Sequence, residues 1–192
     1  MNEPTPTVPL AAPVDVRHQP SQWPLRDKVR RVAWMFVQTF LFRPSFHNWY
    51  GWRRLLLRAM GAKVGRGVRV RPSVRIEIPW NLDLGDDSVV GDYAILYSLG
   101  TIRLGRRVTV SQYAHLCAGT HDYTDPTFPL QTPPVVVGDD AWVATEAFLG
   151  PGVTVGARAV VGARAVVVKD VPPEQVWAGN PARFIKTRGP RA

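Results

Sequence analysis

The chain has 192 residues, of which 45% are hydrophobic, and a formal net charge of +9. This length suffices for one well-buried domain with a small addition, and it excludes a bifunctional enzyme of two full domains. The single cysteine, Cys117, excludes an intramolecular disulfide and a zinc ribbon and indicates a reducing compartment.

Positive charge is concentrated in the N-terminal part of the chain. Residues 1–71 carry 13 Lys and Arg against 3 Asp and Glu, whereas residues 72–192 carry 11 against 12. A basic region of this kind is often a nucleic-acid surface. Here it has no recognisable nucleic-acid motif, and its apolar and aromatic residues recur at helical spacing. This pattern favours an anionic membrane surface over a nucleic acid as the partner, so no nucleic-acid binding is expected.

The first 24 residues are rich in Pro and Thr and are expected to be a flexible segment. They lack the basic and apolar regions of a signal peptide. The longest apolar run, VAWMFVQTFLF at 32–42, has about half of the roughly 20 residues that cross a bilayer. Neither export nor a membrane span is expected, which predicts a cytoplasmic protein.

Residues 25–61 are predicted to form a basic helical cap of two helices. The first helix, which Pro44 ends, has an apolar stripe of Val29, Val32, Ala33, Phe36, Val37 and Phe40. The stripe of the second helix consists of Trp52, Leu55, Leu56, Ala59 and Met60, with Arg53, Arg54 and Arg58 off it. We expect the stripes to cover the open end of the domain that follows. The residues left to face lipid are then Arg30, Arg31, Trp34 and Phe42.

Between residues 62 and 172 an aliphatic side chain recurs at every sixth position within five groups of three, with two extra residues after the first and second groups and fifteen after the third. The fifteen positions are Val64, Val70, Ile76, Leu84, Val90, Leu96, Leu104, Val110, Leu116, Val137, Val143, Leu149, Val155, Val161 and Val167. An amphipathic helix would need spacings of three and four. A chain that turns every six residues makes three flat faces per coil, so about five stacked coils form a prism around one aliphatic column. A sandwich of hairpins, the alternative, would turn less regularly.

Glycine and small residues share this period. Glycine follows eight of the fifteen aliphatic positions, where we expect it to supply the positive φ of a tight corner. Small or β-branched residues that fit a narrow interior stand four positions after most of them; they are Ser88, Ala94, Ala114, Ala141, Ala147, Val153, Ala159 and Ala165.

Residues 118–134, AGTHDYTDPTFPLQTPP, interrupt the period after the third coil. Leu116 and Val137 on either side are 21 residues apart instead of six, which is an insertion of fifteen residues. A coil that only stacks on its neighbours has no place for such an insertion, so we expect a protruding loop that forms one wall of a binding site. The loop contains His121, one of four histidines. Residues 173–192 are expected to form a C-terminal tail.

Three motifs point to a known family. VGARAVVGARAV, the following KDVPP, and AGNPAR near the end resemble the hexapeptide-repeat acyltransferases over residues 64–188. WRRLLLRAMGAKVG and HDYTDPTFPL narrow the resemblance to the colanic acid biosynthesis acetyltransferase group, which modifies sugars of bacterial exopolysaccharide. The resemblance implies a left-handed parallel β-helix, a homotrimer, and acetyl-coenzyme A (acetyl-CoA) bound between neighbouring subunits.

The resemblance also implies site residues. His121 matches the catalytic histidine, which would remove the proton of a sugar hydroxyl as its oxygen attacks the thioester. Asp122 is either an orienting partner of the imidazole or a solvated loop carboxylate. The coenzyme positions are matched by Trp142, Ala144, Thr145 and Ala163 along the pantetheine arm and by Lys169 and Arg183 at the phosphates. Candidate acceptor contacts are Asp92, Tyr97 and Glu146, the last of which otherwise faces solvent.

Two alternatives concern the chemistry. Cys117 lies four residues before His121, which allows a Cys–His nucleophile, although beside Leu116 it also fits as a wall residue. γ-Class carbonic anhydrases share the β-helix and bind zinc through three histidines. His115 and His121 would stack on successive coils, but the other two histidines lie outside the repeat, so no metal is expected.

Two further alternatives concern the role of the protein. The acceptor can be a small amine, serine or an antibiotic instead of a sugar. A trimeric prism that only docks a partner, without catalysis, is the other possibility.

Overall fold

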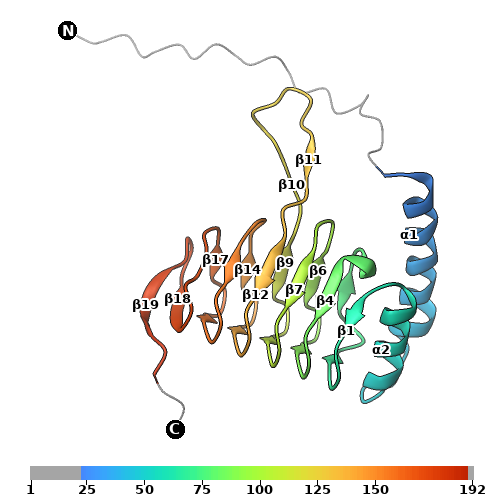
Figure 1. Cartoon of the computed structure of the whole chain (residues 1–192), viewed down its shortest axis with the longest axis horizontal. Coiled ribbons are helices and arrows are strands. Elements are labelled where there is room, and N and C mark those ends of the chain that lie inside the picture. Colours follow the sequence, from blue (N-terminus) through green and yellow to red (C-terminus); the bar gives the residue numbers. More distant parts are fainter. Residues whose placement is uncertain (1–22, 190–192) are drawn as a thin grey trace.

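The predicted β-helix is confirmed. The computed structural model describes residues 23–189, so most of the segment expected at 1–24 lies outside the described residues. Three sheets, here called A, B and C, form the sides of a prism whose strands run parallel from coil to coil (Figure 1). A hairpin rises from the middle of the prism, and helices cover its N-terminal end.

The strands of one sheet lie about one coil apart in the sequence. Sheet A contains β1 (Lys63–Val64), β4 (Leu82–Leu84), β7 (Ile102–Leu104), β12 (Val135–Val137) and β15 (Thr154–Val155). Sheet B contains β2 (Arg69–Val70), β5 (Val89–Val90), β8 (Thr109–Val110), β13 (Trp142–Val143), β16 (Val160–Val161), β18 (Gln175–Ala178) and β19 (Arg183–Thr187). Sheet C contains β3 (Arg75–Ile76), β6 (Ile95–Tyr97), β9 (His115–Cys117), β14 (Phe148–Leu149) and β17 (Val166–Val167).

The remaining elements lie outside these sheets. The hairpin consists of β10 (Thr120–His121) and β11 (Leu130–Gln131). The helices are α1 (Leu25–Val37), the π-helical turn η2 (Gln38–Phe42), α2 (Tyr50–Ala59) and the 3₁₀ turn η3 (Pro79–Asn81).

The predicted aliphatic positions form the core. All of them except Val64 are buried, and those of one sheet lie in register, as Val70, Val90 and Val110 do in sheet B. The predicted small residues are buried at the corners as well. Burying one such aliphatic side chain contributes about 1.5–3 kcal/mol, so this column is the main source of stability.

The glycines of the repeat do not have the predicted role. None of the eight has a positive φ, which falls instead two residues later, at Asp87 and Tyr93 for example. A Cβ on Gly85 would lie 2.5 Å from the carbonyl carbon of Gly105 on the next coil. Glycine is needed at these positions because neighbouring coils approach each other too closely for a side chain, and not because of its φ.

The prism continues beyond the five predicted coils. β18 adds a parallel strand to sheet B after β16, which makes about six coils, and β19 then turns back antiparallel to β18. The expected C-terminal tail therefore contains two strands. The period is hard to see there because Pro172 and Pro173 interrupt it, although Val171 still pairs with Val155 and Trp177 with Val161.

The helix α1 covers the prism with the face opposite to the predicted one. Trp34 is 2% exposed and donates from Nε1 to the carbonyl of Ile76 at 2.9 Å, and Phe42 is fully buried against it. The residues expected to cap, among them Val29, Phe36 and Phe40, are more than half exposed. Both faces of α1 are apolar. The face with Trp34 packs against the prism because the indole N–H can donate to a backbone carbonyl of the end coil.

The helix α2 buries an arginine that was predicted to lie off its packed stripe. Arg53 is fully buried, and its guanidinium donates to the carbonyls of Val70 (2.6 Å), Phe46 (2.9 Å) and His47 (2.7 Å) and to the Ser45 hydroxyl (2.8 Å). Desolvation lowers the pKa of Arg53. This side chain joins α2, the turn before it and the first coil.

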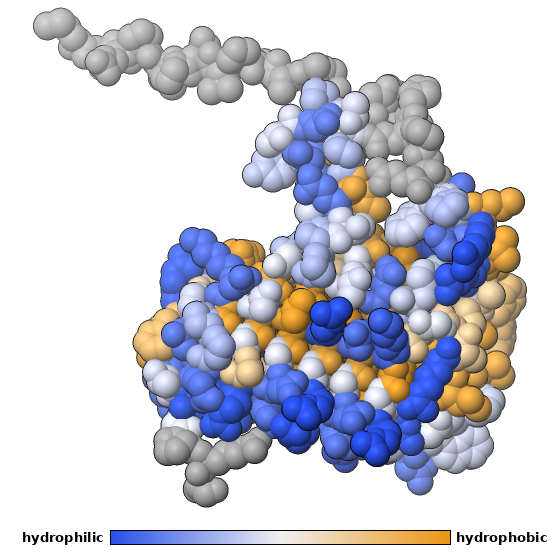
Figure 2. Space-filling model, viewed as in Figure 1, coloured by the Kyte–Doolittle hydropathy of each residue, from blue (hydrophilic) through white to orange (hydrophobic). Residues whose placement is uncertain are grey.

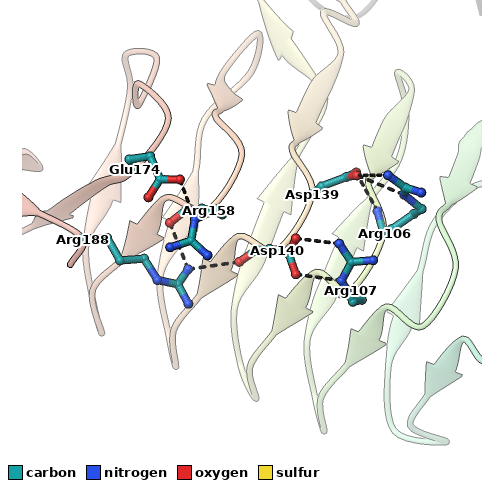
Figure 3. A network of polar contacts seen from close by, with 7 residues as sticks. All are labelled: Arg106, Arg107, Asp139, Asp140, Arg158, Glu174 and Arg188. Carbon is teal, nitrogen blue, oxygen red and sulfur yellow. Dashed lines mark hydrogen bonds and ion pairs between the residues drawn. The ribbon is translucent and has the colours of Figure 1, made fainter. Parts of the chain in front are cut away.

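An edge of the prism carries a ladder of arginine and acidic side chains (Figure 3). Arg107 forms two hydrogen bonds with the Asp140 carboxylate, at 2.8 and 2.7 Å, and Arg106 pairs with Asp139 on the same two coils. Arg188, just after β19, donates to the carbonyls of Asp140 and Arg158. Exposed ion pairs contribute little each. The ion pairs join neighbouring coils, and Arg188 ties the segment after β19 to them.

Candidate active site

The predicted loop is a hairpin that projects from one edge of the prism. β9 of sheet C precedes it and β12 of sheet A follows it. β10 and β11 pair in antiparallel fashion, with His121 opposite Leu130. In Figure 1 the hairpin stands clear of the coils. His121 is thus presented away from the chain's own core, at the edge between sheets C and A.

The His121 imidazole is held by Phe128, which lies in the hairpin turn before β11. Nδ1 lies 2.9 Å from the carbonyl oxygen of Phe128, and the two rings stack with centroids 4.4 Å apart and planes at 8°. A carbonyl oxygen only accepts, so Nδ1 carries the hydrogen in this contact. In the neutral ring Nε2 is then unprotonated, and because the residue is exposed it can accept a proton from a ligand.

The carboxylates of Asp122 and Asp125 build the hairpin turn. Asp122 accepts from the hydroxyl and the N–H of Thr124, at 2.6 and 2.9 Å, and Asp125 binds Thr127 in the same way. The hydrogen bond from the Thr124 hydroxyl, and then that from its N–H, lower the pKa of Asp122. The imidazole Nδ1 contacts the Phe128 carbonyl, whereas the Asp122 carboxylate accepts from Thr124 and from the Gln131 side chain.

Cys117 and Tyr97 lie where the hairpin leaves the prism. The Cys117 thiol is half-buried and donates to the carbonyl of Gly119 at 3.2 Å, and burial raises its pKa. A thiol in this setting is a poor nucleophile, which supports the wall-residue interpretation. Tyr97 flanks the same place, since a Cβ on Gly119 would lie 3.3 Å from its ring.

The predicted pantetheine positions gather on a different edge, between sheets B and C. Trp142 is 46% exposed and donates from Nε1 to the Ser111 hydroxyl at 2.9 Å. Ala144 is buried, and its N–H is used by the next coil, so it forms the wall. The N–H groups of Thr145 and Ala163, one coil apart, have no hydrogen-bond partner within residues 23–189. They are available to the carbonyl oxygens of an extended ligand.

The predicted phosphate-binding cations lie at the C-terminal end of the prism. Lys169 follows β17, and Arg183 begins β19 next to Ala182, whose N–H donates to Val166 of β17. Both side chains are exposed, and neither has a carboxylate partner in the described part of the chain. Ala163 lies at the corner between sheets B and C, and Arg183 belongs to sheet B. Lys169 follows sheet C, so it lies at the corner between sheets C and A, on the edge from which the hairpin projects.

A shallow hollow continues the edge between sheets B and C toward the N-terminal coils. The residues that line it include Arg71, Asp92, Tyr93, Gln112 and Tyr113. The two tyrosine rings stack with centroids 5.1 Å apart and planes at 11°, and both are more than half exposed. The Asp92 carboxylate faces Arg71 at 3.3 Å. An aromatic surface beside paired charges suits a ligand with both apolar faces and polar groups.

The tyrosine pair was missed by the sequence reasoning, although the sequence contains a signal for it. Tyr-Ala occurs at the same point of two coils, in GDYA at 91–94 and in SQYA at 111–114, 20 residues apart. Each tyrosine has a left-handed φ of 59°, unusual for an aromatic residue. Two exposed aromatic residues at equivalent corners point to a binding surface rather than to packing.

Glu146 occupies the next corner along this edge and is paired with the coil beyond. Its carboxylate accepts from the Arg164 guanidinium at 2.5 Å. Both side chains are largely exposed, so the pair is accessible to a ligand.

The zinc alternative has no support in the structure. His115 pairs with Ile95 and Phe148 on the neighbouring coils, whereas His121 lies in the hairpin, so the two histidines do not stack as predicted. Burial lowers the pKa of His115. Within residues 23–189, no three His, Cys, Asp or Glu side chains gather as a metal site.

The coiled prism with a six-residue period, the hairpin that presents a histidine and the edge with free amides together define the hexapeptide-repeat acyltransferase class. No protein-family model matches the chain. A protein of Escherichia coli (strain K12) named "Putative colanic acid biosynthesis acetyltransferase WcaF" is 46% identical over 162 residues, which cover 84% of this chain and 89% of the relative.

Solved structures agree with this class. A maltose O-acetyltransferase from Clostridium difficile 630 matches with a TM-score of 0.76 and 28% identity, over 84% of this chain and 88% of that one. A galactoside acetyltransferase in complex with coenzyme A shares the fold, with a TM-score of 0.79 and 24% identity over 88% and 86% of the two chains. The chain therefore belongs to the hexapeptide-repeat acetyltransferases, in the family of the colanic acid biosynthesis relative.

Proposed function

We propose that this acetyltransferase transfers the acetyl group of acetyl-CoA to a hydroxyl of a sugar in exopolysaccharide biosynthesis, with His121 as general base. The name of the 46% identical relative supports the pathway. The contact that carries the chemistry is the hydrogen bond from His121 Nδ1 to the Phe128 carbonyl, because it leaves Nε2 free to accept a proton. An alcohol is a poor nucleophile at neutral pH, so a base of this kind is needed.

The reaction is a direct transfer. His121 Nε2 takes the hydroxyl proton as the oxygen bonds to the thioester carbonyl carbon, which gives a tetrahedral oxyanion. The C–S bond then breaks, and the imidazolium returns the proton to the departing thiolate sulfur. Free backbone N–H groups of the edge between sheets B and C, at Gln112 or Thr145, are suited to hold the oxyanion.

The position of the hairpin supports a homotrimer. The hairpin that contains His121 leaves the prism at the edge between sheets C and A. Trp142, Thr145 and Ala163 lie on the edge between sheets B and C. Among the described residues, the His121 ring contacts only its own hairpin. A neighbouring subunit that offers its edge to the hairpin would bring base and coenzyme together, and three such contacts close a ring.

The acceptor is assigned to the hollow beside this edge. Asp92 lines it and can accept hydrogen bonds from sugar hydroxyls, and the stacked rings of Tyr93 and Tyr113 can hold an apolar face of the sugar. Glu146, at the next corner of the same edge, lies between the hollow and the coenzyme positions. Tyr97, at the base of the hairpin, would contact the acceptor from the side of the catalytic histidine.

In this proposal the enzyme works in the cytoplasm, peripherally at the inner membrane surface, where a lipid-linked sugar would present its hydroxyl. Helices long and apolar enough to cross a membrane are absent from residues 23–189.

Replacing Lys169 or Arg183 with alanine should weaken binding of coenzyme A by roughly 10-fold, because each loses a charge-assisted contact with phosphate. Titration calorimetry with coenzyme A and its 3′-dephospho form is the measurement, and the loss should be smaller for the dephospho form. Lys186→Ala, an exposed cation of β19, is the control and should bind normally. Equal losses for both forms would refute the 3′-phosphate assignment.

The function is tested by thiol release from acetyl-CoA with a panel of acceptors. Oligosaccharides and lipid-linked sugars should give thiol and an acetyl ester, whereas serine, small amines and chloramphenicol should not. Ester and amide products are distinguished by mass spectrometry and by the lability of the ester to alkali. Release with an amine or antibiotic alone would identify a different acceptor class, and no release with any acceptor would favour the non-catalytic scaffold.

A further inference from the structure

The helix α1 turns an apolar stripe away from the prism. Leu25, Val29, Val32, Phe36 and Phe40 recur at spacings of three and four, and they are 76, 61, 51, 56 and 65% exposed. Trp34 on the opposite side of the helix is the residue that packs on the end coil. The stripe therefore has no role in closing the prism.

The stripe is continued by apolar residues of η2 and α2. Trp52 donates from Nε1 to the carbonyl of Leu41 at 3.0 Å, which places the two elements side by side. Leu41 and Leu55 are 45 and 57% exposed, and the rings of Phe46 and Trp49 stack edge to face on the turn before α2. Figure 2 shows apolar residues gathered over the end of the molecule where these helices lie. These residues and the stripe are here called the outer apolar face.

Positive charge borders this face. Residues 23–60 carry eight Arg and Lys, of which Arg53 is buried, Arg30 pairs with Asp27 at 3.8 Å and Arg31 pairs with Glu77 at 2.6 Å. Arg26, Lys28 and Arg43 are exposed and form no ion pair within the described residues. Apolar and aromatic side chains bordered by unpaired cations are the pattern of a helix that lies in the headgroup layer of an anionic bilayer.

We propose that the outer apolar face is a docking surface for a lipid bilayer with anionic headgroups. α1 lies along the membrane with Val29, Val32 and Phe36 in the boundary between headgroups and acyl chains, and Arg26 and Lys28 on its flanks reach the lipid phosphates. The hairpin and the edge between sheets B and C remain above the membrane. The proposal does not depend on acetyl transfer.

Charge favours the bilayer over a second copy of the chain as the occupant. Two outer apolar faces placed against each other would bring together two surfaces of the same sign, each bordered by Arg26, Lys28 and Arg43, which have no acidic partner among residues 23–189. Like charges in contact oppose association, whereas an anionic surface attracts each of these cations, by roughly 1 kcal/mol per residue.

The test is co-sedimentation with vesicles of phosphatidylcholine that contain rising fractions of phosphatidylglycerol, at low and high salt. The full chain should bind anionic vesicles, more weakly at high salt, and neutral vesicles at least 10-fold less. Val29→Gln/Phe36→Gln/Phe40→Gln and Arg26→Gln/Lys28→Gln/Arg43→Gln should each lose at least 10-fold. The control, Arg66→Gln/Arg103→Gln/Lys186→Gln, removes three exposed charges of the prism and should bind within about twofold of the parent.

All the substituted residues are exposed, so thermal transitions and turnover with a soluble acceptor should be unchanged. If the parent has normal turnover but does not bind anionic vesicles, the docking proposal is overturned and the catalytic proposal is left intact. Equal losses in the control would show a general charge effect and also overturn it. The face is a subunit interface if two results occur together. The parent does not bind vesicles, and the apolar variant has a lower oligomeric mass than the parent in analytical ultracentrifugation.

Discussion

Replacing His121 with alanine should lower turnover by about 10²- to 10⁴-fold, because the substrate hydroxyl then has no base to accept its proton. Binding of coenzyme A and the thermal transition should change little, since the side chain is exposed and contacts only its own hairpin. Steady-state kinetics with a sugar acceptor is the measurement.

Asp122→Asn is the matched control for this experiment. The amide oxygen of asparagine can still accept from Thr124, so the turn and the Phe128 carbonyl should stay in place and turnover should remain within about 10-fold of the parent. Activity of His121→Ala within 10-fold of the parent would sink the base assignment. A larger loss in Asp122→Asn than in His121→Ala would move the chemistry to the carboxylate.

Arg53→Ala should lower the free energy of unfolding by about 3–5 kcal/mol, which makes it the most destabilising single change expected in the helical cap. The substitution removes four donors at once and leaves the carbonyls of Phe46, His47 and Val70 without them. Urea denaturation followed by circular dichroism measures the loss.

Arg58→Ala in the same helix provides the comparison. Its side chain binds the carbonyls of Val64 and Gly65 at an exposed position, so water can replace it, and the expected loss is below about 1 kcal/mol. Arg53→Lys should be nearly as damaging as alanine, because a single ammonium cannot reach acceptors in so many directions. If Arg53→Ala and Arg58→Ala had equal effects, the buried guanidinium would not be what holds the cap.

The fold could be predicted from the sequence because the β-helix repeats a local rule. Each aliphatic position needs only its own coil and the next, so the period of six is visible without knowledge of distant contacts. The helical cap lacks such a rule. Both sides of α1 are apolar, and only the acceptor at Ile76 decides that Trp34 faces inward. The burial of Arg53 likewise depends on Val70, which is 17 residues away.

The sequence predicted the protruding loop that contains His121, but not the contacts within it. The insertion pointed to His121, but the residue that fixes its tautomer is Phe128, across a turn whose shape depends on Asp122 and Asp125. We expected Asp122 to bind its neighbour His121, but the Asp122 carboxylate instead accepts hydrogen bonds from Thr124 in the turn. The tyrosine pair required knowing that residues 20 apart lie at equivalent corners, which becomes evident once the coil length is fixed.

The reversed direction of β19 bears on how long an assembly of this chain can grow. A parallel coil offers at its last turn the same backbone groups as every earlier turn, so the repeat alone would permit prisms to stack end to end into filaments. β19 runs against β18 and occupies that edge of sheet B, with Arg183 and Lys186 on the exposed strand. At the other end α1 and α2 cover the first coil. Both ends of the prism are therefore closed to the addition of further coils, so an assembly of this chain is expected to stay finite.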